Sequence, residues 1–257
     1  MSNLALRAIP KRLAPNLHES VYRWINPSWY KSDVGGMWDE IGKLQFDFLL
    51  DQGLAPTDRL LDIGCGSLRG GVHFVRYLET SHYFGIDINE RHLQGGRAEL
   101  QRLGLGDKQA TLLCDGCFQF SRFAQQFDLA LAQSVFSHLP FNAIMRCLTN
   151  VEAVLVPGGR LYATFFPNNG PRLRVDEIRI PRPDGASWPW SVHCDADPFY
   201  YDPDIFRWAV EGSSLTCTLL GDWGHPRGQH MLLFTKAGPV AGPKPRGAPG
   251  SPRTDVR

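Results

Sequence analysis

The stretch from Arg59 to Gly71 constrains the fold of this 257-residue chain more than any other. Its apolar start, Leu60 to Ile63, predicts a buried parallel strand, and the residues after Gly66 take up helical spacing. A strand that turns through glycines into a helix brings backbone N–H groups and the positive end of a helix to the carboxyl edge of a sheet. This arrangement predicts an α/β fold that binds a nucleotide-like ligand at that edge.

The spacing of the glycines argues against a dinucleotide. The fingerprint Gly-x-Gly-x-x-Gly would need a glycine at position 69, where this chain has Arg69, and it has no place for the acid Asp62. Asp-x-Gly-x-Gly at the end of a first strand resembles motif I of the class I S-adenosylmethionine-dependent methyltransferases. The resemblance implies that Gly64 and Gly66 let the backbone approach the methionine part of the cofactor. Asp62 would orient this loop or meet the cofactor's amino group, and Arg69 would meet its carboxylate or pair with a surface acid.

Two later strand ends carry acids in the order that the resemblance requires. Tyr83 to Asn89 predicts a second strand ending in Asp87, whose carboxylate can accept two hydrogen bonds from a ribose diol. Thr111 to Gly116 predicts a third strand ending in Asp115, which the resemblance assigns to the adenine amino group. The expected cofactor-binding residues are Asp62, Gly64, Cys65, Gly66, Arg69, Asp87, Ile88, Asp115, Gly116, Gln133 and Ser134.

The rest of the chain continues the alternation of strands and helices. Beyond a first helix at about 37–52, the predicted elements are a fourth strand with its loop (127–139), a helix (141–156), a turn (157–159), a fifth strand (160–166), a helix (203–211) and a closing antiparallel pair (214–220 and 230–235). The resemblance covers about 59–166. It implies a Rossmann-like, doubly wound seven-stranded sheet with an aromatic insert after the fifth strand.

The sequence divides into one domain with two flanking segments. We expect an N-terminal arm or lid at 1–33, a methyltransferase domain at 34–236 and a tail at 237–257. The arm is rich in aromatic residues. It could also pack onto the body of the domain or contact a second copy of the chain, instead of forming a lid. The tail is rich in proline and glycine and has few apolar residues, which predicts disorder. Within the domain, 167–202 forms an acceptor-side insert.

Methyl transfer to an alcohol needs a general base, and histidine is the commonest. His138 follows the fourth strand and is the first candidate for the base. The alternative is a structural histidine that is hydrogen-bonded within the loop or caps the next helix. His193, in the aromatic insert, is the second. His193, Asp195 and Asp197 also form a weak pattern for a divalent metal, which we do not predict.

The insert supplies the candidates for acceptor binding: Trp188, Trp190, Tyr200 and Tyr201. Aromatic faces beside Asp, His and Arg suit a sugar ring as the acceptor, and they suit a phenol almost as well. The alternative to acceptor binding is that these side chains form a packed lid. Gln133 to Phe136 stands where enzymes that methylate base or glutamine amino groups carry Asn/Asp-Pro-Pro-Tyr/Phe, and that motif is absent. This absence disfavours a nucleic-acid acceptor.

Composition narrows the function further. A formal net charge of +1 shows no global basic bias, so nothing in the composition points to a surface for nucleic acid or acidic membranes. No run of residues has the length and apolarity of a membrane helix or a signal peptide, so we expect a cytoplasmic protein. Cys114 and Cys117 form a single C-x-x-C, which favours reduced thiols over a metal site.

The predicted function is S-adenosylmethionine-dependent O-methylation of a small polar acceptor, with a carbohydrate such as a sugar or oligosaccharide preferred. A homodimer is possible. The alternatives are O- or N-methylation of a phenolic or secondary metabolite, and a cofactor-binding regulatory protein without catalysis.

Overall fold

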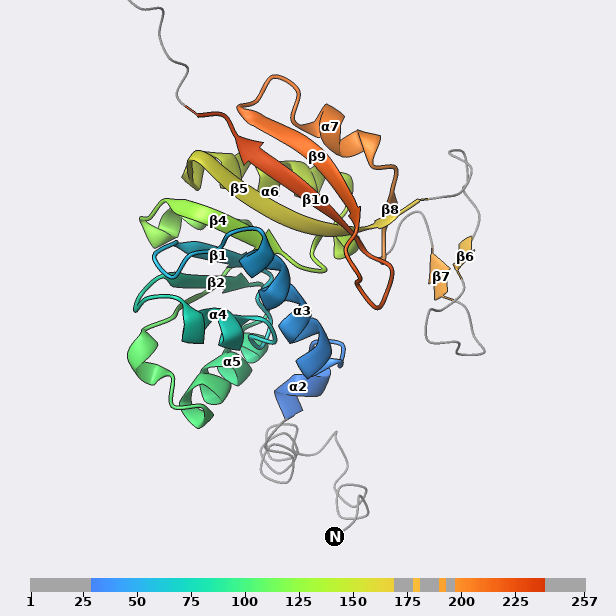
Figure 1. The fold of residues 1–257 in the computed structure, drawn as a ribbon. Coiled ribbons are helices and arrows are strands. Elements are labelled where there is room, and N and C mark those ends of the chain that lie inside the picture. Colours follow the sequence, from blue (N-terminus) through green and yellow to red (C-terminus); the bar gives the residue numbers. More distant parts are fainter. Residues whose placement is uncertain (1–28, 169–177, 181–189, 193–196, 239–257) are drawn as a thin grey trace, which may run out of the picture.

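The computed structural model describes residues 29–168, 178–180, 190–192 and 197–238 (Figure 1). The arm before Trp29, the tail after Gly238, and Trp188, His193 and Asp195 of the insert lie outside these residues. Among the described residues, no helix combines the length and apolarity needed to cross a membrane.

One mixed sheet organises the molecule. Its hydrogen-bonded order is β3-β2-β1-β4-β5-β10-β9, in which β1 to β5 are parallel and β10 runs antiparallel to both neighbours. The strands are β1 (Leu60–Ile63), β2 (Tyr83–Asp87), β3 (Thr111–Cys114), β4 (Phe127–Ala132), β5 (Leu155–Pro167), β9 (Leu215–Asp222) and β10 (His230–Lys236). This order confirms the predicted doubly wound sheet with a closing antiparallel pair.

The segment after β5 adds short strands that the sequence did not predict. β8 (Tyr200–Tyr201) pairs in parallel with the end of β5 and makes the sheet eight-stranded. β6 (Ile178–Ile180) and β7 (Trp190–Val192) form a separate antiparallel pair. Figure 1 shows this pair beyond β8, away from the main sheet.

The predicted turn at Pro157-Gly158-Gly159 is wrong. These residues belong to β5, which begins at Leu155 directly after α6 (Phe141–Val154). The pairing of β5 with β4 shifts register there, because Phe127 pairs with Leu155 but Leu129 pairs with Arg160. Gly158 has φ +79°, so the glycine forms an irregularity inside a strand instead of a turn between two elements.

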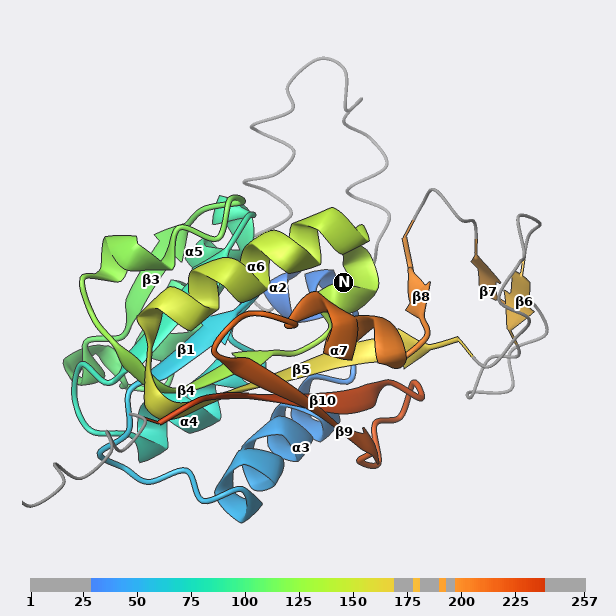
Figure 2. The same cartoon turned by 90° about the horizontal axis from the view of Figure 1, so that it is seen from above.

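The helices form a layer on each face of the sheet (Figure 2). They are α2 (Trp29–Asp33), α3 (Trp38–Asp51), α4 (Gly71–Tyr77), α5 (Glu90–Arg102), α6 and α7 (Asp204–Ala209), with short 3-10 turns η2 (Gly106–Lys108), η3 (Phe120–Phe123) and η4 (Phe136–His138). α6 and α7 pack with Leu61 and Phe84 in one buried cluster, whereas α3, α4 and α5 pack with Leu60 in the other. Since adjacent strand residues face opposite layers, β1 is buried throughout.

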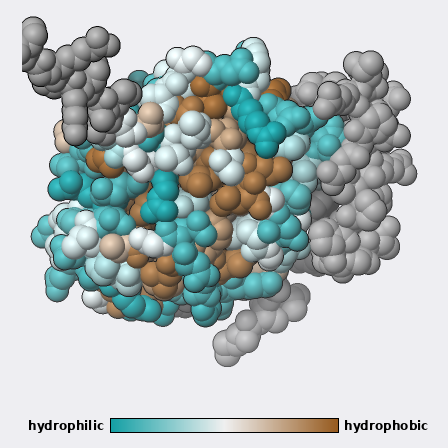
Figure 3. All heavy atoms as spheres, turned by 45° about the horizontal axis from the view of Figure 1, so that its top comes forward, coloured by the Kyte–Doolittle hydropathy of each residue, from teal (hydrophilic) through white to brown (hydrophobic). Residues whose placement is uncertain are grey.

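The last strands leave part of one face uncovered. β9 is the edge strand, and its residues alternate between exposed and more buried positions from Leu215 onward. Leu220 is among the exposed large apolar side chains. Figure 3 shows apolar side chains gathered over the β9–β10 end of the molecule, within a hydrophilic surround.

The described end of the N-terminal arm packs onto the body through a buried carboxylate. Glu99 of α5 is 1% exposed and accepts a hydrogen bond from the Tyr30 hydroxyl at 2.5 Å. Arg102 and Lys31 pair with the same carboxylate at 2.6 and 3.2 Å. A Cβ on Gly95 would lie 2.4 Å from the Tyr30 Cβ, so glycine at this position lets α2 approach α5.

We expect Glu99→Gln to loosen α2 in a pH-dependent way. The Arg102 hydrogen bond is the main cause that lowers the pKa of Glu99 from 4.5 to about 2. The stabilisation by Glu99 is therefore complete above pH ~4.5 and is lost as pH falls towards ~2. At pH 7 the variant should lose about 1–3 kcal/mol of unfolding free energy, measured with urea, and less at pH 3.

Glu90→Gln is the matched control for this prediction. Glu90 pairs with Arg97 at 2.7 Å, but both side chains are nearly half exposed, so its removal should cost less than ~1 kcal/mol. Equal losses for the two variants, or a Glu99→Gln loss that is unchanged at pH 3, would contradict the assignment.

Candidate functional site

The carboxyl ends of β1 and β2 are joined at the glycine loop. The Gly64 N–H donates to the Ile86 carbonyl at 2.8 Å, and the Gly66 N–H donates to Asp87 Oδ2 at 2.9 Å. Gly64 and Gly66 have φ +68° and +55°. A Cβ on Gly64 would lie 2.5 Å from Val135 Cγ2, and one on Gly66 would lie 2.9 Å from Val34 Cγ1. Both the backbone angle and the close approach therefore require glycine.

Asp87 is held by main-chain donors on both oxygens. Besides the Gly66 contact, Oδ1 accepts the Asn89 N–H at 2.8 Å and lies 3.4 Å from Nδ1 of His92. Each carboxylate oxygen has a second lone pair, so the group can still accept a hydrogen bond from a ligand hydroxyl. The structure thus brings the glycine loop and the expected ribose acid into direct contact.

Asp115 lies at the end of β3 and shapes the loop that follows. Its Oδ1 accepts the N–H groups of Cys117 and Gln119 at 2.7 and 3.2 Å, and Arg122 lies 3.4 Å from Oδ2. Cys114 and Cys117, on either side of this acid, are free thiols. The expected adenine acid therefore has its own loop and an arginine as partners.

An apolar side chain lies near the tips of β2 and β3. Ile88 directly follows Asp87 and is 76% exposed, which is unusual for a large apolar residue at a strand end. A Cβ on Gly116 would meet Ile88 Cδ1 at 2.8 Å, so the two residues pack closely. Ile88 and Gly116 offer an open apolar surface that a flat ring can cover.

Asp62 lies below the loop, and its side chain bonds to neither loop N–H group. It is buried in β1 and accepts a hydrogen bond from the Tyr83 hydroxyl at 2.6 Å. Burial raises the pKa of Asp62 from 3.8 to about 7, and the Tyr83 hydrogen bond opposes that rise. The contact that the structure shows for Asp62 is therefore with the start of β2.

Arg69 holds the N-terminal segment against the glycine loop. Its Nη1 donates to the carbonyls of Val34 and Gly36 at 3.0 and 2.9 Å, and the side chain is buried. Burial lowers the pKa of Arg69 from 12.5 to about 10. The surface ion pair considered from the sequence is therefore not what this arginine forms. Arg91 pairs with Asp33 at 3.2 Å and also binds this segment.

A buried polar network holds the loop after β4. Ser134 N–H donates to Thr164 Oγ1 at 2.7 Å, and the Ser134 and Thr164 hydroxyls donate to Gln229 Oε1 at 3.1 and 2.6 Å. The Gln133 amide lies 3.0 Å from His225 Nε2. Gln133 and Ser134, which the sequence places in the cofactor set, are thus tied to the loop between β9 and β10.

His225 is a neutral member of that network. The Arg227 N–H donates to its Nδ1 at 3.2 Å, so the neutral ring carries its proton on Nε2 and needs an acceptor there. In the described residues, Gln133 Oε1 has no hydrogen-bond partner. Turning the Gln133 amide over would bring this oxygen opposite the imidazole N–H, at the loss of the Nε2 contacts with Ser134 Oγ at 2.9 Å and Gln229 Oε1 at 3.4 Å. Spacing along the sequence gave no sign of this pairing.

His138 carries a carboxylate partner at the end of η4. Its Nδ1 lies 2.7 Å from Asp197 Oδ2, and both side chains are more than half exposed. The Phe199 N–H donates to the Ser137 carbonyl at 2.7 Å and fixes the segment of Asp197 beside η4. In the described part of the chain, no group of three metal-ligand side chains occurs. Asp197, which the sequence placed in a metal pattern, is the partner of His138.

The two described tyrosines of the insert have different surroundings. The Tyr201 hydroxyl donates to the Leu139 carbonyl at 2.5 Å, and its ring packs on Phe206. Tyr200 stacks on Phe166 with ring centroids 5.0 Å apart. Its hydroxyl is buried and has no hydrogen-bond partner among the described residues. Tyr201 is therefore bound within the fold, whereas the Tyr200 hydroxyl is left for a further partner.

Comparison with known proteins gives one family match and several structural matches. Residues 61–161 match the family model of a methyltransferase domain. The magnesium protoporphyrin IX methyltransferase from Synechocystis PCC 6803 with bound SAM is 13% identical, with 85% of this chain and 91% of that chain covered and a TM-score of 0.55.

Two further solved structures are similar to the same extent. The CcbJ methyltransferase from Streptomyces caelestis is 14% identical, covers 76% of this chain and 89% of its own, and has a TM-score of 0.58. The glycopeptide N-methyltransferase MtfA, complexed with S-adenosyl-L-homocysteine, is 15% identical, covers 77% and 90%, and has a TM-score of 0.55. At these identities the likeness shows the fold.

We expect His225→Gln to make the protein less sensitive to acid. Burial, with Arg227 and Arg69, lowers the pKa of His225 from 6.5 to about 4. Below pH 6.5 the unfolded chain binds a proton that the folded chain does not, so stability falls as pH drops from 6.5 towards 4. Urea unfolding at pH 7.5 and pH 5 should show a loss on the order of 2 kcal/mol smaller for the variant than for the wild type.

Histidine NMR gives an independent measurement of the same quantity. The ring protons of His225 should titrate near pH 4 in the folded protein. A midpoint at the ordinary value of 6.5, or parallel stability profiles for variant and wild type, would contradict the buried neutral ring.

Proposed function

Because this chain carries a class I S-adenosylmethionine-dependent methyltransferase domain, we propose that it methylates a hydroxyl of a small polar acceptor, with a carbohydrate preferred. The single observation that carries this proposal is the contact between the Gly66 N–H and Asp87. It joins the loop that admits the methionine part of the donor to the acid that receives its ribose.

The residues at the sheet edge fit the donor in chemistry and in order. Asp87 keeps acceptor capacity for a ribose diol, and Asp115 offers a carboxylate for an exocyclic amino group. The open side chain of Ile88 can cover one face of an adenine ring. The absence of a Cβ at Gly64 and Gly66 leaves the backbone free to approach the ligand. When bound, S-adenosylmethionine supplies a methyl carbon activated by the sulfonium.

We assign the general base to His138. With the donor bound, the acceptor oxygen would attack the methyl carbon as the carbon–sulfur bond breaks, and the His138 imidazole would take the hydroxyl proton. Asp197 at Nδ1 orients the ring and stabilises the imidazolium, which leaves Nε2 to take the proton. Charge balances because the sulfonium becomes a neutral thioether while the base gains the proton. His193, the second candidate, lies outside the described residues.

The side chains beyond β5 favour a sugar as the acceptor. The Tyr200 hydroxyl needs a hydrogen-bond partner, and its ring stacks on Phe166. A sugar ring, with hydroxyls at its edge and apolar faces, matches that mixture. Trp188 and the Trp190 side chain, the other two candidates, lie outside the described residues. The formal charge of +1 shows no overall basic bias, which supports a small-molecule acceptor over nucleic acid.

The nitrogen-directed alternative has one supporting observation. A glycopeptide N-methyltransferase is among the proteins that share this fold. An amine acceptor would also need a base for its proton, so the His138–Asp197 pair fits both reactions. Measuring products from hydroxyl and amine acceptors separates them.

The cofactor assignment predicts the effect of Asp87→Ala on binding. Calorimetry with S-adenosylhomocysteine should give a dissociation constant about 10- to 100-fold weaker than the wild type, since hydrogen bonds to a charged carboxylate are lost. Asp107→Ala, at an exposed position on η2, is the matched control and should bind like the wild type. If the wild type fails to bind at millimolar ligand, or if Asp87→Ala binds as tightly, the assignment is wrong.

The base assignment predicts a loss of turnover without a loss of donor binding. His138→Ala should reduce turnover about 10²- to 10⁴-fold while the affinity for S-adenosylhomocysteine stays unchanged. Asp197→Asn should give a smaller loss. The assay follows S-adenosylhomocysteine formation with sugars, phenols and amines. Unchanged turnover in His138→Ala moves the base elsewhere, and a wild type that consumes no donor with any acceptor favours a regulatory, non-catalytic role.

A further inference from the structure

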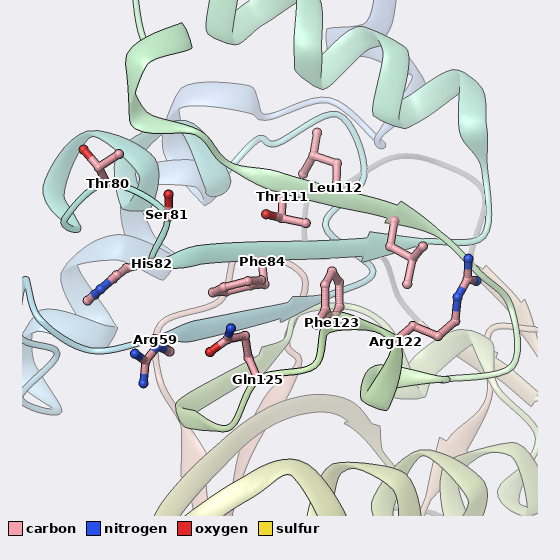
Figure 4. Close-up of a pocket in the computed structure, with 11 residues that line it drawn as sticks. Arg59, Thr80, Ser81, His82, Phe84, Thr111, Leu112, Arg122, Phe123 and Gln125 are labelled. Carbon is pink, nitrogen blue, oxygen red and sulfur yellow. The ribbon is translucent and has the colours of Figure 1, made fainter.

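A pocket of about 540 Å³ opens over one face of the sheet, beside β2 and β3. It is lined by Thr111 to Leu113 of β3, by Phe84 near the start of β2, by residues just before β1 and β2, and by the η3 segment (Figure 4). Its volume falls within the range of small-molecule sites. None of the residues assigned to the donor or the base lines it.

The pocket exists because the crossover from β3 to β4 is short. Between these strands the chain forms only the 3-10 turn η3, whereas α6 follows β4 and covers the same face farther along. Phe84 of β2 and Thr111 of β3 are register partners and point to this face. Phe123 and Gln125 cover them only in part. An opening is therefore left where a longer helix would have packed.

The lining combines cationic groups with an apolar floor. Phe84 and Phe123 meet edge to face with centroids 5.5 Å apart. Figure 4 shows His82 and Arg59 on one side of these rings and Arg122 on the other. This arrangement matches a ligand with a compact apolar group and a negative charge at one end.

The nearby carboxylates leave the Arg59 guanidinium available. Asp128 accepts the main-chain N–H of Arg59 at 2.8 Å, and no ion pair of the Arg59 side chain occurs within the described ranges. Arg122, by contrast, is shared with Asp115 at 3.4 Å. Arg59 is thus the better partner for an anion, since Arg122 already pairs with Asp115, the expected adenine acid.

His82 adds a polar atom that lacks a partner. Its Nδ1 is buried, and within the described part of the chain nothing hydrogen-bonds to it. The His82 side chain is among those that line the pocket. A buried polar atom without a partner costs stability, which makes a ligand or a rearrangement at this position favourable.

We propose that this pocket is a second binding site, for a small organic anion such as a phosphate monoester or carboxylate that carries a compact ring. Arg59 and His82 bind the anionic oxygens, and the ring lies against Phe84 and Phe123. The site is distinct from methyl transfer because none of the residues assigned to the donor or the base lines it, although Arg122 links its lining to Asp115.

The test is calorimetry of the full chain with phenyl phosphate, with inorganic phosphate and phenol as the two incomplete probes. Phenyl phosphate should bind once per chain, at least tenfold tighter than either incomplete probe. Arg59→Gln and His82→Phe should each weaken it at least fivefold. Arg146→Gln, at an exposed position of α6, is the charge-matched control and should bind like the wild type.

Two further measurements test whether the probe binds at this pocket. Saturating S-adenosylhomocysteine should leave the phenyl phosphate stoichiometry unchanged, whereas competition would place the probe in the donor site and overturn the proposal. Without probe, His82→Phe should melt at or above the wild-type temperature, because it removes an unpaired polar atom. Absence of phenyl phosphate binding up to about 10 mM, or equal binding by both pocket variants, also overturns it.

Discussion

The hydrogen bond between the Gly66 N–H and Asp87 is the contact on which the site depends. It fixes the tip of β1 to the tip of β2, and it forms only because Gly66 adopts a positive φ. Asp87 in turn receives the Asn89 N–H, which begins α5. One carboxylate therefore sets the glycine loop, the end of a strand and the start of a helix. The cradle for the donor is consequently organised before any ligand arrives.

Three arginines extend that organisation to the N-terminal segment. Arg69 and Arg227 bind carbonyls of the stretch between α2 and α3, and Arg91 pairs with Asp33 at the end of α2. Val34 of this stretch lies against Gly66. Arg69 is buried, and the charge of Asp62 below it partly opposes the fall of its pKa. The segment is therefore held over the glycine loop by hydrogen bonds from arginines to its main-chain carbonyls. A lysine in place of Arg69 would hold it less well, because lysine lacks the planar fork of donors.

How far the sequence predicts the site depends on how local each contact is. The strand ends and the acids Asp87 and Asp115 follow from apolar runs and glycine spacing, which are read within a few residues. The pairing of His138 with Asp197 joins positions 59 residues apart, and no periodicity reports it. The role of Arg69 depends on carbonyls more than 30 residues away. The turn predicted at Gly158 failed for a different reason, because a glycine irregularity inside a strand has the same local composition as a turn.

The loop after β4 is held in place by segments from the C-terminal half of the chain. Its start is held by Gln229 and His225, from the loop between the last two strands, and its end is held by the segment of Asp197 and Phe199. Most of the proposed donor residues, by contrast, lie at the ends of β1, β2 and β3. The two sets are not independent, because Gln133 and Ser134, expected to bind the donor, lie on this loop, and Val135 of the same loop lies against Gly64. The contacts of the C-terminal half therefore reach the proposed donor site through the loop that also leads to His138.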